Sequence, residues 1–359
     1  MDDVITVDDT FSADRALRLI GRGSALHWTG DFHNAKQLLA ALGRRVPVRR
    51  DGPFHTQRRR QAERARILNS LHVPMHDHTI TLRRAPDVRA AYEEAFGPQG
   101  KEGPGEERPH GDRPGRERTP AAGPRWVPLR ELLGVIGAYE LRHRGVYVPA
   151  LGQRIHPHYG VFAPTRSEYA DLIAGQPLPT TGTAFDVGTG TGLLAAILSR
   201  RGIRHVVATD NNPRAITCAR DNLRRLQMNA TVLETDLFPP GRADLVVCNP
   251  PWIPATPITP LDHAVYDEDG RMLRTFLNTV RDHLEPGGEV WLILSDLAEL
   301  LGLRSRGELL ELVRGGGLEV VGRADITPRH RRARAETTSL WQLRPATTPA
   351  AAGLHRATE

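Results

Sequence analysis

The second half of the sequence alternates short apolar segments with helical ones, and this alternation limits the fold more than any other feature. Seven segments have the length of strands, and helical stretches separate the first six, which is typical of an α/β domain with a largely parallel sheet. Only a loop (TPRHRRARAE) joins the last two, so we expect a terminal antiparallel hairpin. The expected strands are Thr183–Val187, His205–Thr209, Thr231–Glu234, Asp244–Cys248, Glu289–Leu294, Leu318–Asp325 and Thr337–Leu343, and the clearest helices are Leu193–Arg201, Pro213–Leu226, Met272–His283 and Glu308–Val313.

Polar or glycine residues follow the first four strands. The first strand runs into Asp186-Val-Gly188-Thr-Gly190-Thr-Gly192, where glycines permit a tight turn and close approach of a ligand to the backbone. The second strand leads to Asp210, 24 residues after Asp186, where a carboxylate can accept from ribose hydroxyls. A glycine loop alone would equally suit a dinucleotide.

The third and fourth strand ends sharpen this interpretation. Asp236 follows the third strand, where it can face the exocyclic amine of an adenine, and the fourth ends in Asn249-Pro250-Pro251-Trp252. Each acidic residue alone could be a helix cap or a solvated strand end. A dinucleotide-binding enzyme gives no account of the Asn-Pro-Pro-Trp sequence.

Together these motifs resemble the class I S-adenosylmethionine-dependent methyltransferases, and within them the Asn-Pro-Pro-aromatic amino-group enzymes, which include release-factor glutamine methyltransferases and adenine methylases. The resemblance covers roughly residues 159–343, and residues 161–169 (VFAPTRSEY) are similar to a proline-containing segment of the glutamine methyltransferases. It implies a seven-stranded Rossmann-like fold and S-adenosylmethionine as cofactor. The cofactor-binding residues that it implies are Asp186, Gly188, Gly190 and Gly192 at the methionine end, Asp210 and Asn211 at the ribose, Asp236 at the adenine, and Asn249.

The residues from Asn249 to Trp252 carry the expected chemistry. The Asn249 side-chain carbonyl and the Pro250 backbone carbonyl can both accept from a planar NH2 group and stabilise the positive charge that develops on its nitrogen. Trp252 offers a flat face for stacking. The alternative is a proline-rich turn with Trp252 packed in the core. Tryptophan in place of the commoner tyrosine or phenylalanine leaves the acceptor open.

Before this domain we expect a smaller, mainly helical region. Its helices are predicted at Phe11–Ile20, Ala35–Leu42 and Arg58–Leu71. Residues 97–125 contain thirteen Gly or Pro in 29 positions, which predicts a flexible linker or surface insertion. The expected organisation is therefore a helical domain at 1–96, the linker or insertion at 97–125, a helical connector at 126–158 with a helix at Pro128–Arg142, the methyltransferase domain at 159–344, and a frayed tail at 345–359.

Composition points to a soluble, cytoplasmic protein. No run approaches the roughly 18 apolar residues of a membrane helix, the acidic N-terminus does not resemble a signal peptide, and Cys218 and Cys248 are too few for a disulfide framework. Both cysteines are expected to be small buried apolar residues. We expect no metal, because three nearby histidines, His72, His76 and His78, fit surface positions better than a zinc site. His156 and His158 could line the mouth of the pocket, although an ordinary loop is the simpler expectation.

The net charge of +6 makes anionic partners plausible. Nine arginines lie between Arg44 and Arg66, and the terminal hairpin carries Arg323, Arg329, Arg331, Arg332 and Arg334. These could bind RNA, DNA or an acidic protein, or they could be a solvated face of an arginine-rich chain. The sequence thus predicts N-methylation of a nucleic-acid base amine or protein side-chain amide. The alternatives are a small-molecule N-methyltransferase with the N-terminal region as a lid, and a binding protein without catalysis, which the intact Asp186, Asp210 and Asn249 disfavour.

Overall fold

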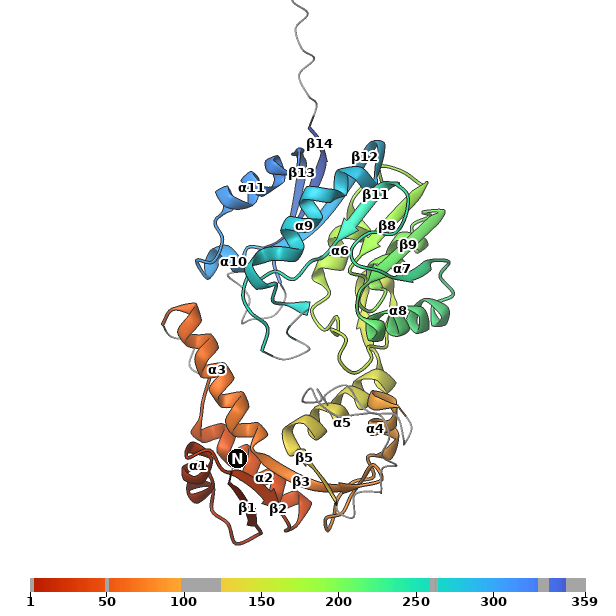
Figure 1. The fold of residues 1–359 in the computed structure, drawn as a ribbon. Coiled ribbons are helices and arrows are strands. Elements are labelled where there is room, and N and C mark those ends of the chain that lie inside the picture. Colours follow the sequence, from red (N-terminus) through yellow and green to blue (C-terminus); the bar gives the residue numbers. More distant parts are fainter. Residues whose placement is uncertain are drawn as a thin grey trace, which may run out of the picture. The chain divides into compact units, whose positions relative to one another are not determined.

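The computed structural model describes residues 3–48, 52–97, 124–258, 262, 264–328 and 336–346. Contacts divide the chain into two units, Met1–His143 and Arg144–Glu359 (Figure 1). Most of the expected linker or insertion, the arginine-rich tip of the hairpin and the C-terminal tail lie outside the described residues. Among the described helices, none is long and apolar enough to cross a membrane.

The second unit contains a seven-stranded sheet of order β10-β9-β8-β11-β12-β14-β13. The pairs from β10 to β12 are parallel, whereas β12–β14 and β14–β13 are antiparallel, which confirms the predicted terminal hairpin. The seven-stranded Rossmann-like fold is therefore present. Its strands are β8 (Thr183–Val187), β9 (His205–Asp210), β10 (Thr231–Glu234), β11 (Ala243–Cys248), β12 (Leu284–Ser295), β13 (Leu318–Ile326) and β14 (Thr338–Pro345).

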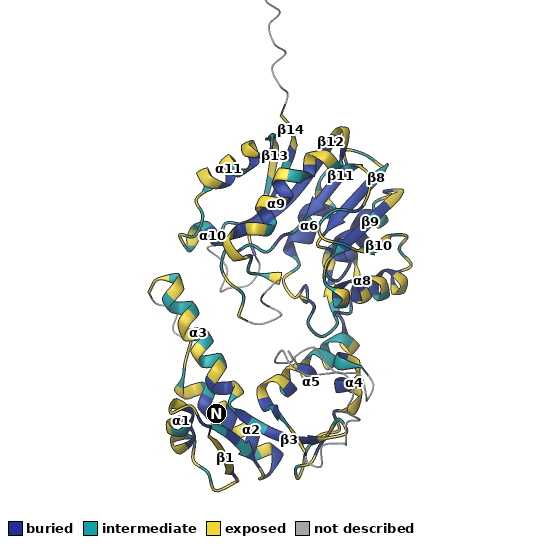
Figure 2. Ribbon diagram, in the orientation of Figure 1, coloured by how far each residue is buried: buried dark blue, intermediate teal, exposed yellow. Residues whose placement is uncertain are grey.

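Helices cover both faces of this sheet, and its central strands β8, β11 and β12 are largely buried (Figure 2). On one face a core cluster joins the sheet to α6 (Glu168–Gly175), α7 (Leu193–Arg200) and α8 (Pro213–Arg225). On the other face a second cluster joins it to α9 (Arg271–Thr279) and α11 (Arg306–Gly315). Burial of both faces explains why the strands are continuous apolar runs. The remaining elements are β6 (Val146–Val148), β7 (Gln153–Ile155), α10 (Leu297–Leu300), and the 3-10 turns η1 (Pro149–Leu151), η3 (Glu268–Gly270) and η4 (Val280–His283).

The first unit contains the expected helices and also a five-stranded sheet that the sequence analysis missed. β1, β2 and β3 are parallel neighbours, and β4 and β5 pair antiparallel with β3. These strands have two to six residues, too few to show a clear alternation, and β3 includes a proline. The elements are β1 (Val4–Val7), α1 (Ala13–Gly21), β2 (Ala25–Trp28), α2 (Phe32–Arg45), α3 (Phe54–Asn69), β3 (Leu71–His76), β4 (Thr79–Ile80), α4 (Arg89–Phe96), β5 (Arg125–Pro128) and α5 (Leu129–Arg144).

The pairing of β5 with β3 changes the expected boundary between the units. Val127 lies opposite Val73, so the chain returns to the first unit after residues 98–123. That segment therefore interrupts one unit, which fits an insertion and not a linker between domains. Residues 126–143 likewise fall within the first unit.

Candidate active site

The register of the sheet brings the motif-bearing strand ends to one edge. Val187 of β8 lies between Thr209 of β9 and Cys248 of β11, and Cys248 lies opposite Leu292 of β12. Because these strands are parallel, the residues that follow them emerge on the same side. The glycine loop, Asp210 and Asn249 are therefore neighbours, although they are distant in sequence.

The glycine loop has the open backbone expected of a ligand cradle. Gly188, Gly190 and Gly192 all have left-handed φ angles, of +72°, +56° and +81°. At Gly190 a side chain would meet nothing within 4 Å, so this face of the loop is open. A Cβ at Gly192 would instead come within 3.2 Å of the Ala219 backbone, and this glycine permits close packing of the loop against α8.

Asp186 is buried beneath this loop. Its Oδ2 accepts hydrogen bonds from the Thr189 hydroxyl at 2.6 Å and the Ala195 amide at 2.9 Å. Burial nevertheless raises the pKa of Asp186 to about 6, and the charge of Asp210 adds to this shift. The same surroundings raise the pKa of the buried Tyr169 hydroxyl. Asp186 thus occupies a site where a positive charge would be stabilised.

Asp210 ends β9 and is tied to the loop. Its Oδ2 accepts from the Gly190 amide at 3.0 Å and its Oδ1 from the Asn212 amide at 2.9 Å. Burial raises its pKa against these hydrogen bonds. Asn211 is exposed beside it, and Asp236 is exposed two residues beyond β10.

These residues fit S-adenosylmethionine. The cofactor carries a sulfonium and an ammonium group, and the loop offers an open backbone beside two carboxylates whose pKa values are both raised. The buried Asp186 and the half-buried Asp210 together favour a cationic ligand, because its charge would offset the cost of desolvating the carboxylates and reduce their mutual repulsion.

Asn249 follows β11 at the same edge and is half-buried, and Pro250 is buried. The Asn249 Oδ1 accepts a hydrogen bond from the Trp252 indole Nε1 at 2.9 Å. Since an indole N–H only donates, this contact identifies the carbonyl oxygen of the amide and fixes its orientation. Trp252 also packs against both core clusters. This packing agrees with part of the alternative of a core tryptophan, and the contact between Trp252 and Asn249 was not anticipated.

A second polar group lies at this edge that the sequence analysis did not identify. Ser295, at the end of β12, donates to Glu336 Oε1 at 2.8 Å, and Arg166 donates to Oε2 at 3.3 Å. Glu336 is only 6% exposed. Because β12 pairs with β11 on the side opposite to β8, Ser295 and Glu336 lie on that side of the strand that leads to Asn249. The only sequence signals were polar residues at the end of one predicted strand and at the start of another.

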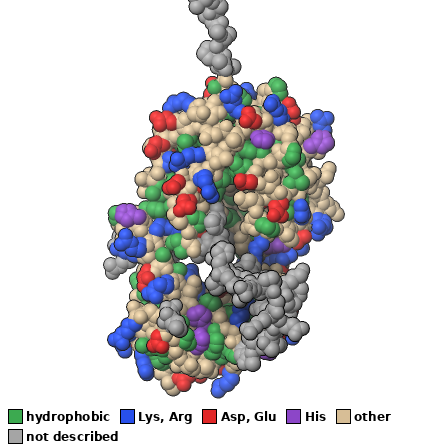
Figure 3. Space-filling model, viewed as in Figure 1, with side chains coloured by type: hydrophobic (Ala, Val, Ile, Leu, Met, Phe, Trp, Pro, Cys, Tyr) green, Lys and Arg blue, Asp and Glu red, His purple; other side chains and the backbone are tan. Residues whose placement is uncertain are grey.

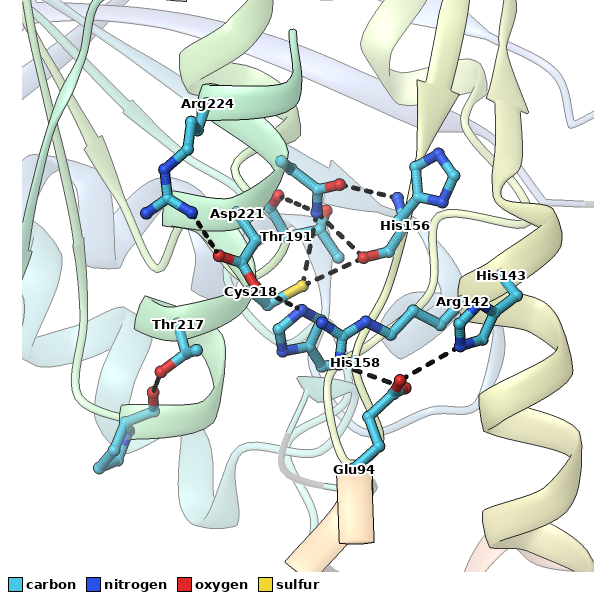
Figure 4. Close-up of polar contacts among 12 residues, drawn as sticks. Glu94, Arg142, His143, His156, His158, Thr191, Thr217, Cys218, Asp221 and Arg224 are labelled. Carbon is cyan, nitrogen blue, oxygen red and sulfur yellow. Dashed lines mark hydrogen bonds and ion pairs between the residues drawn. The ribbon is translucent and has the colours of Figure 1, made fainter. Parts of the chain in front are cut away.

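His156 and His158 lie in a segment attached to α8 (Figure 4). The Asn222 side chain accepts from the His156 amide and donates to the carbonyl oxygens of His156 and Thr191. His158 contacts Asp221 at 3.3 Å. Asn222 thus links the main chain at His156 to the glycine loop at Thr191. Cys218 and Cys248 are fully buried, as predicted.

The remaining sequence candidates are mostly engaged in structural contacts. Arg45 pairs with Asp14, Arg66 with Glu63, and Arg64 donates to backbone carbonyls, so part of the first arginine cluster is internal to its unit. Of the hairpin arginines only Arg323 is described. It pairs with Asp325, and its guanidinium carbon lies 4.6 Å from the centroid of the Trp341 ring.

The three candidate histidines of the first unit, His72, His76 and His78, do not form a metal-binding group. The ring centroids of His72 and His27 are 5.7 Å apart, and His76 pairs with Asp77. Within the described ranges, no three His, Cys, Asp or Glu side chains are arranged to hold a metal ion.

Comparison with known proteins indicates the class of enzyme. The family model "Methyltransferase small domain" matches residues 152–301, which contain the glycine loop, Asp210, Asp236 and Asn249. A putative protein N5-glutamine methyltransferase of Methanocaldococcus jannaschii is 31% identical over 31% of this chain and 61% of its own length. The ribosomal RNA small subunit methyltransferase C of Alcanivorax borkumensis is 27% identical over 42% of this chain and 45% of its length. Release factor glutamine methyltransferases of three bacteria are similar at 30–33% identity.

A probable cobalt-precorrin-6B C(15)-methyltransferase of Methanothermobacter thermautotrophicus is 32% identical over 44% of this chain and 72% of its own length. The chain belongs to the S-adenosylmethionine-dependent methyltransferases. The predicted resemblance to glutamine methyltransferases is confirmed as a similarity. The chain spans about half of the length of the first relatives that it matches. The acceptors named for the relatives are a protein, an RNA and a precorrin.

Proposed function

We propose that this protein transfers a methyl group from S-adenosylmethionine to a planar NH2 nitrogen, either a protein side-chain amide or a nucleic-acid base amine. The observation that carries the proposal is the position of Asn249, Pro250 and Trp252, directly after β11 and between the strand of the glycine loop and β12. Two carbonyl oxygens at that point suit an NH2 donor.

The proposed catalytic residues are Asn249, Pro250 and Trp252. The lone pair of a planar nitrogen is delocalised, so the enzyme must orient the group and stabilise the charge that develops on it. The Asn249 Oδ1 keeps one acceptor position beyond its bond to Trp252, and the Pro250 carbonyl supplies a second. S-adenosylmethionine supplies the electrophilic methyl group when bound. The Trp252 indole holds the Asn249 amide in the required orientation.

The proposed cofactor site follows from the same edge. Asp186, Gly188, Gly190 and Gly192 would surround the methionine portion, and Asp210 and Asn211 the ribose. Asp236 would contact the adenine, and Asn249 would border both cofactor and acceptor. The open face at Gly190 and the raised pKa of Asp186 support this arrangement.

A macromolecular acceptor is supported by the names of two relatives and by the positive charge of the chain. The alternative is a small-molecule N-methyltransferase that acts on a guanidine or amino group. The similarity to an enzyme named for a precorrin, which is a small molecule, supports this alternative. Salt-sensitive association with RNA, DNA or protein would support a macromolecular acceptor, and turnover that does not depend on salt would support a small-molecule acceptor. Both cysteines are buried and reduced, and we propose a cytoplasmic location.

Methylation of cell extract provides the test. The purified protein is incubated with methyl-labelled cofactor and fractionated extract, and mass spectrometry identifies the labelled product. We expect label on an amide or a base amine. Absence of affinity for S-adenosylmethionine and its demethylated product in calorimetry would overturn the proposal.

A further inference from the structure

The second unit contains a cavity of about 420 Å³. It is bounded by α9, α11 and the turn that leads into α11, and Pro254, two residues after Trp252, forms part of its wall. Acidic and basic side chains alternate over this part of the surface (Figure 3). The other described lining residues are Asp269, Gly270, Arg274, Asn278, Leu303, Arg304, Glu308, Glu311, Leu312 and Gly315.

Arg304 is the unusual group in this cavity. Its Nε is buried and has no hydrogen-bond partner within the described part of the chain. Burial lowers the pKa of its guanidinium. Because arginine does not lose its proton in proteins, it cannot avoid the desolvation free energy of burial by becoming neutral. A buried guanidinium N–H without a hydrogen-bond partner therefore requires an explanation.

The neighbouring carboxylates balance the charge of Arg304 without bonding to it. Glu299, Asp267 and Glu308 are close enough to oppose the lowering of its pKa. Each is already engaged: Asp267 accepts from two amides at the start of α9, Glu299 pairs with Arg306, and Glu308 caps α11. The charge is therefore tolerated, and the guanidinium lines the cavity although its Nε is buried and unpaired.

Arg274, on α9, supplies a second guanidinium to the lining of the cavity. It is held by the backbone carbonyl of Asp269, and its positive charge further lowers the pKa of Arg304. Two guanidinium groups that repel each other across a cavity are stabilised when an oxyanion lies between them.

We propose that this cavity binds a carboxylate of the methyl acceptor, with Arg304 and Arg274 as its donors. Asp269, Glu308 and Glu311 also line the cavity, so a single negative charge is tolerated better than a phosphate dianion. The volume also accommodates the residue that carries the carboxylate. The acceptor class is then an acidic peptide segment in preference to a nucleic acid. This inference rests on the proposed function for the identity of the acceptor.

Such a site would hold the acceptor at a distance from the reacting nitrogen. Pro254 connects the cavity wall to the loop that begins at Asn249. Binding of a carboxylate here would therefore place the following part of the acceptor near the strand ends, and remote binding energy would be used for orientation.

Nuclear magnetic resonance of the full chain with ¹⁵N-labelled arginine tests the proposal without turnover. The Arg304 Nε–H signal is assigned by its loss in Arg304→Lys. We expect N-acetyl-L-glutamate to shift this signal in a saturable way, whereas N-acetyl-L-glutamine and inorganic phosphate leave it in place. Arg274→Gln should weaken the binding of N-acetyl-L-glutamate at least tenfold, and Arg314→Gln, at the exposed end of α11 and outside the cavity lining, should not.

Three results would overturn the proposal: no shift with N-acetyl-L-glutamate, equal shifts with the glutamine analogue, or a shift with phosphate alone, which would indicate a nucleic-acid backbone. Arg274 is exposed, so its variant keeps the test valid if Arg304 variants do not fold. Cofactor affinity, measured separately by calorimetry, distinguishes failure of this site from failure of the proposed function. A shift at Arg304 in a protein that binds no cofactor would support the cavity and refute the methyltransferase assignment of the acceptor.

Discussion

The proposed cofactor side and the proposed acceptor side of the sheet edge, the latter taken to include Ser295, Glu336 and Arg166, are built from contacts between residues at different distances in sequence. Asp186 bonds to Thr189 and Ala195, three and nine residues away, and Asp210 bonds to Gly190, twenty residues away. On the acceptor side Ser295 and Glu336 are 41 residues apart, and Arg166 and Glu336 are 170 apart. The relatives are all named as methyltransferases, and the acceptors in their names differ. The contacts of the proposed cofactor residues are thus local in sequence, whereas the contacts beside Asn249 depend on the assembled fold.

The largest expected effect is the loss of kcat on substitution of Asn249, on the proposed acceptor side. Asn249→Ala removes an oxygen that would stabilise charge on the attacked nitrogen, and kcat should fall roughly 10²- to 10³-fold. The dissociation constant of S-adenosylmethionine should change little. Single-turnover methylation and calorimetry measure the two quantities, and Asn229→Ala, an exposed asparagine, is the matched control. Unchanged turnover would remove Asn249 from its role.

Asp210→Ala tests the cofactor side. Loss of charge-assisted hydrogen bonds to the ribose should raise the cofactor dissociation constant about 10- to 100-fold. Asp244 provides the control, because it also accepts a backbone amide, from Thr183, but at the opposite end of the parallel strands. Asp244→Ala should lower stability and leave cofactor affinity intact. Equal affinity losses in both variants would show that the effect at Asp210 is structural.

This difference in range also explains what the sequence could predict. The seven strands and the glycine loop are evident because long apolar runs and short motifs occur within a few residues of each other. The first unit's sheet was missed, since strands such as Val4–Val7 and Ala25–Trp28 are too short to show a period. The bond between Trp252 and Asn249 and the burial of Glu336 depend on rotamers and on distant segments, which no local pattern specifies.

The pH dependence of cofactor binding would sharpen the comparison. The pKa of Asp186 is raised to about 6 without a cationic partner, so below pH 6 the group must release a proton before it can face a positive ligand. Affinity should therefore be constant above pH 7 and about tenfold weaker at pH 5. Calorimetry across this range measures it. Asp186→Asn should bind weakly with a flat profile, and an unchanged slope in that variant would assign the titration elsewhere.

The same group should affect folding. Because the folded-state pKa of Asp186 exceeds its unfolded value, its contribution to stability is fully present below about pH 4 and is lost as the pH rises through 6. The contribution of Asp186 to folding stability thus falls as the pH rises, whereas its contribution to cofactor affinity increases. Cofactor should accordingly stabilise the protein more at pH 7 than at pH 5, as thermal unfolding with and without cofactor can show.

The smallest effect is expected at Trp252, where two roles can be separated. Trp252→Phe keeps an aromatic face but removes the indole N–H that orients Asn249. A neutral hydrogen bond contributes about 1 kcal/mol, so kcat should fall about fivefold with little change in cofactor affinity. Trp252→Ala also removes the packing against both core clusters, and should lower the stability of the second unit as well as kcat. If Trp252→Phe is fully active while Trp252→Ala is not, the aromatic face matters and the orientation of the amide must be set by the backbone around Pro250. If both lose activity equally without loss of stability, the indole N–H is the essential group, and the departure from the commoner tyrosine or phenylalanine is a functional feature of this acceptor site.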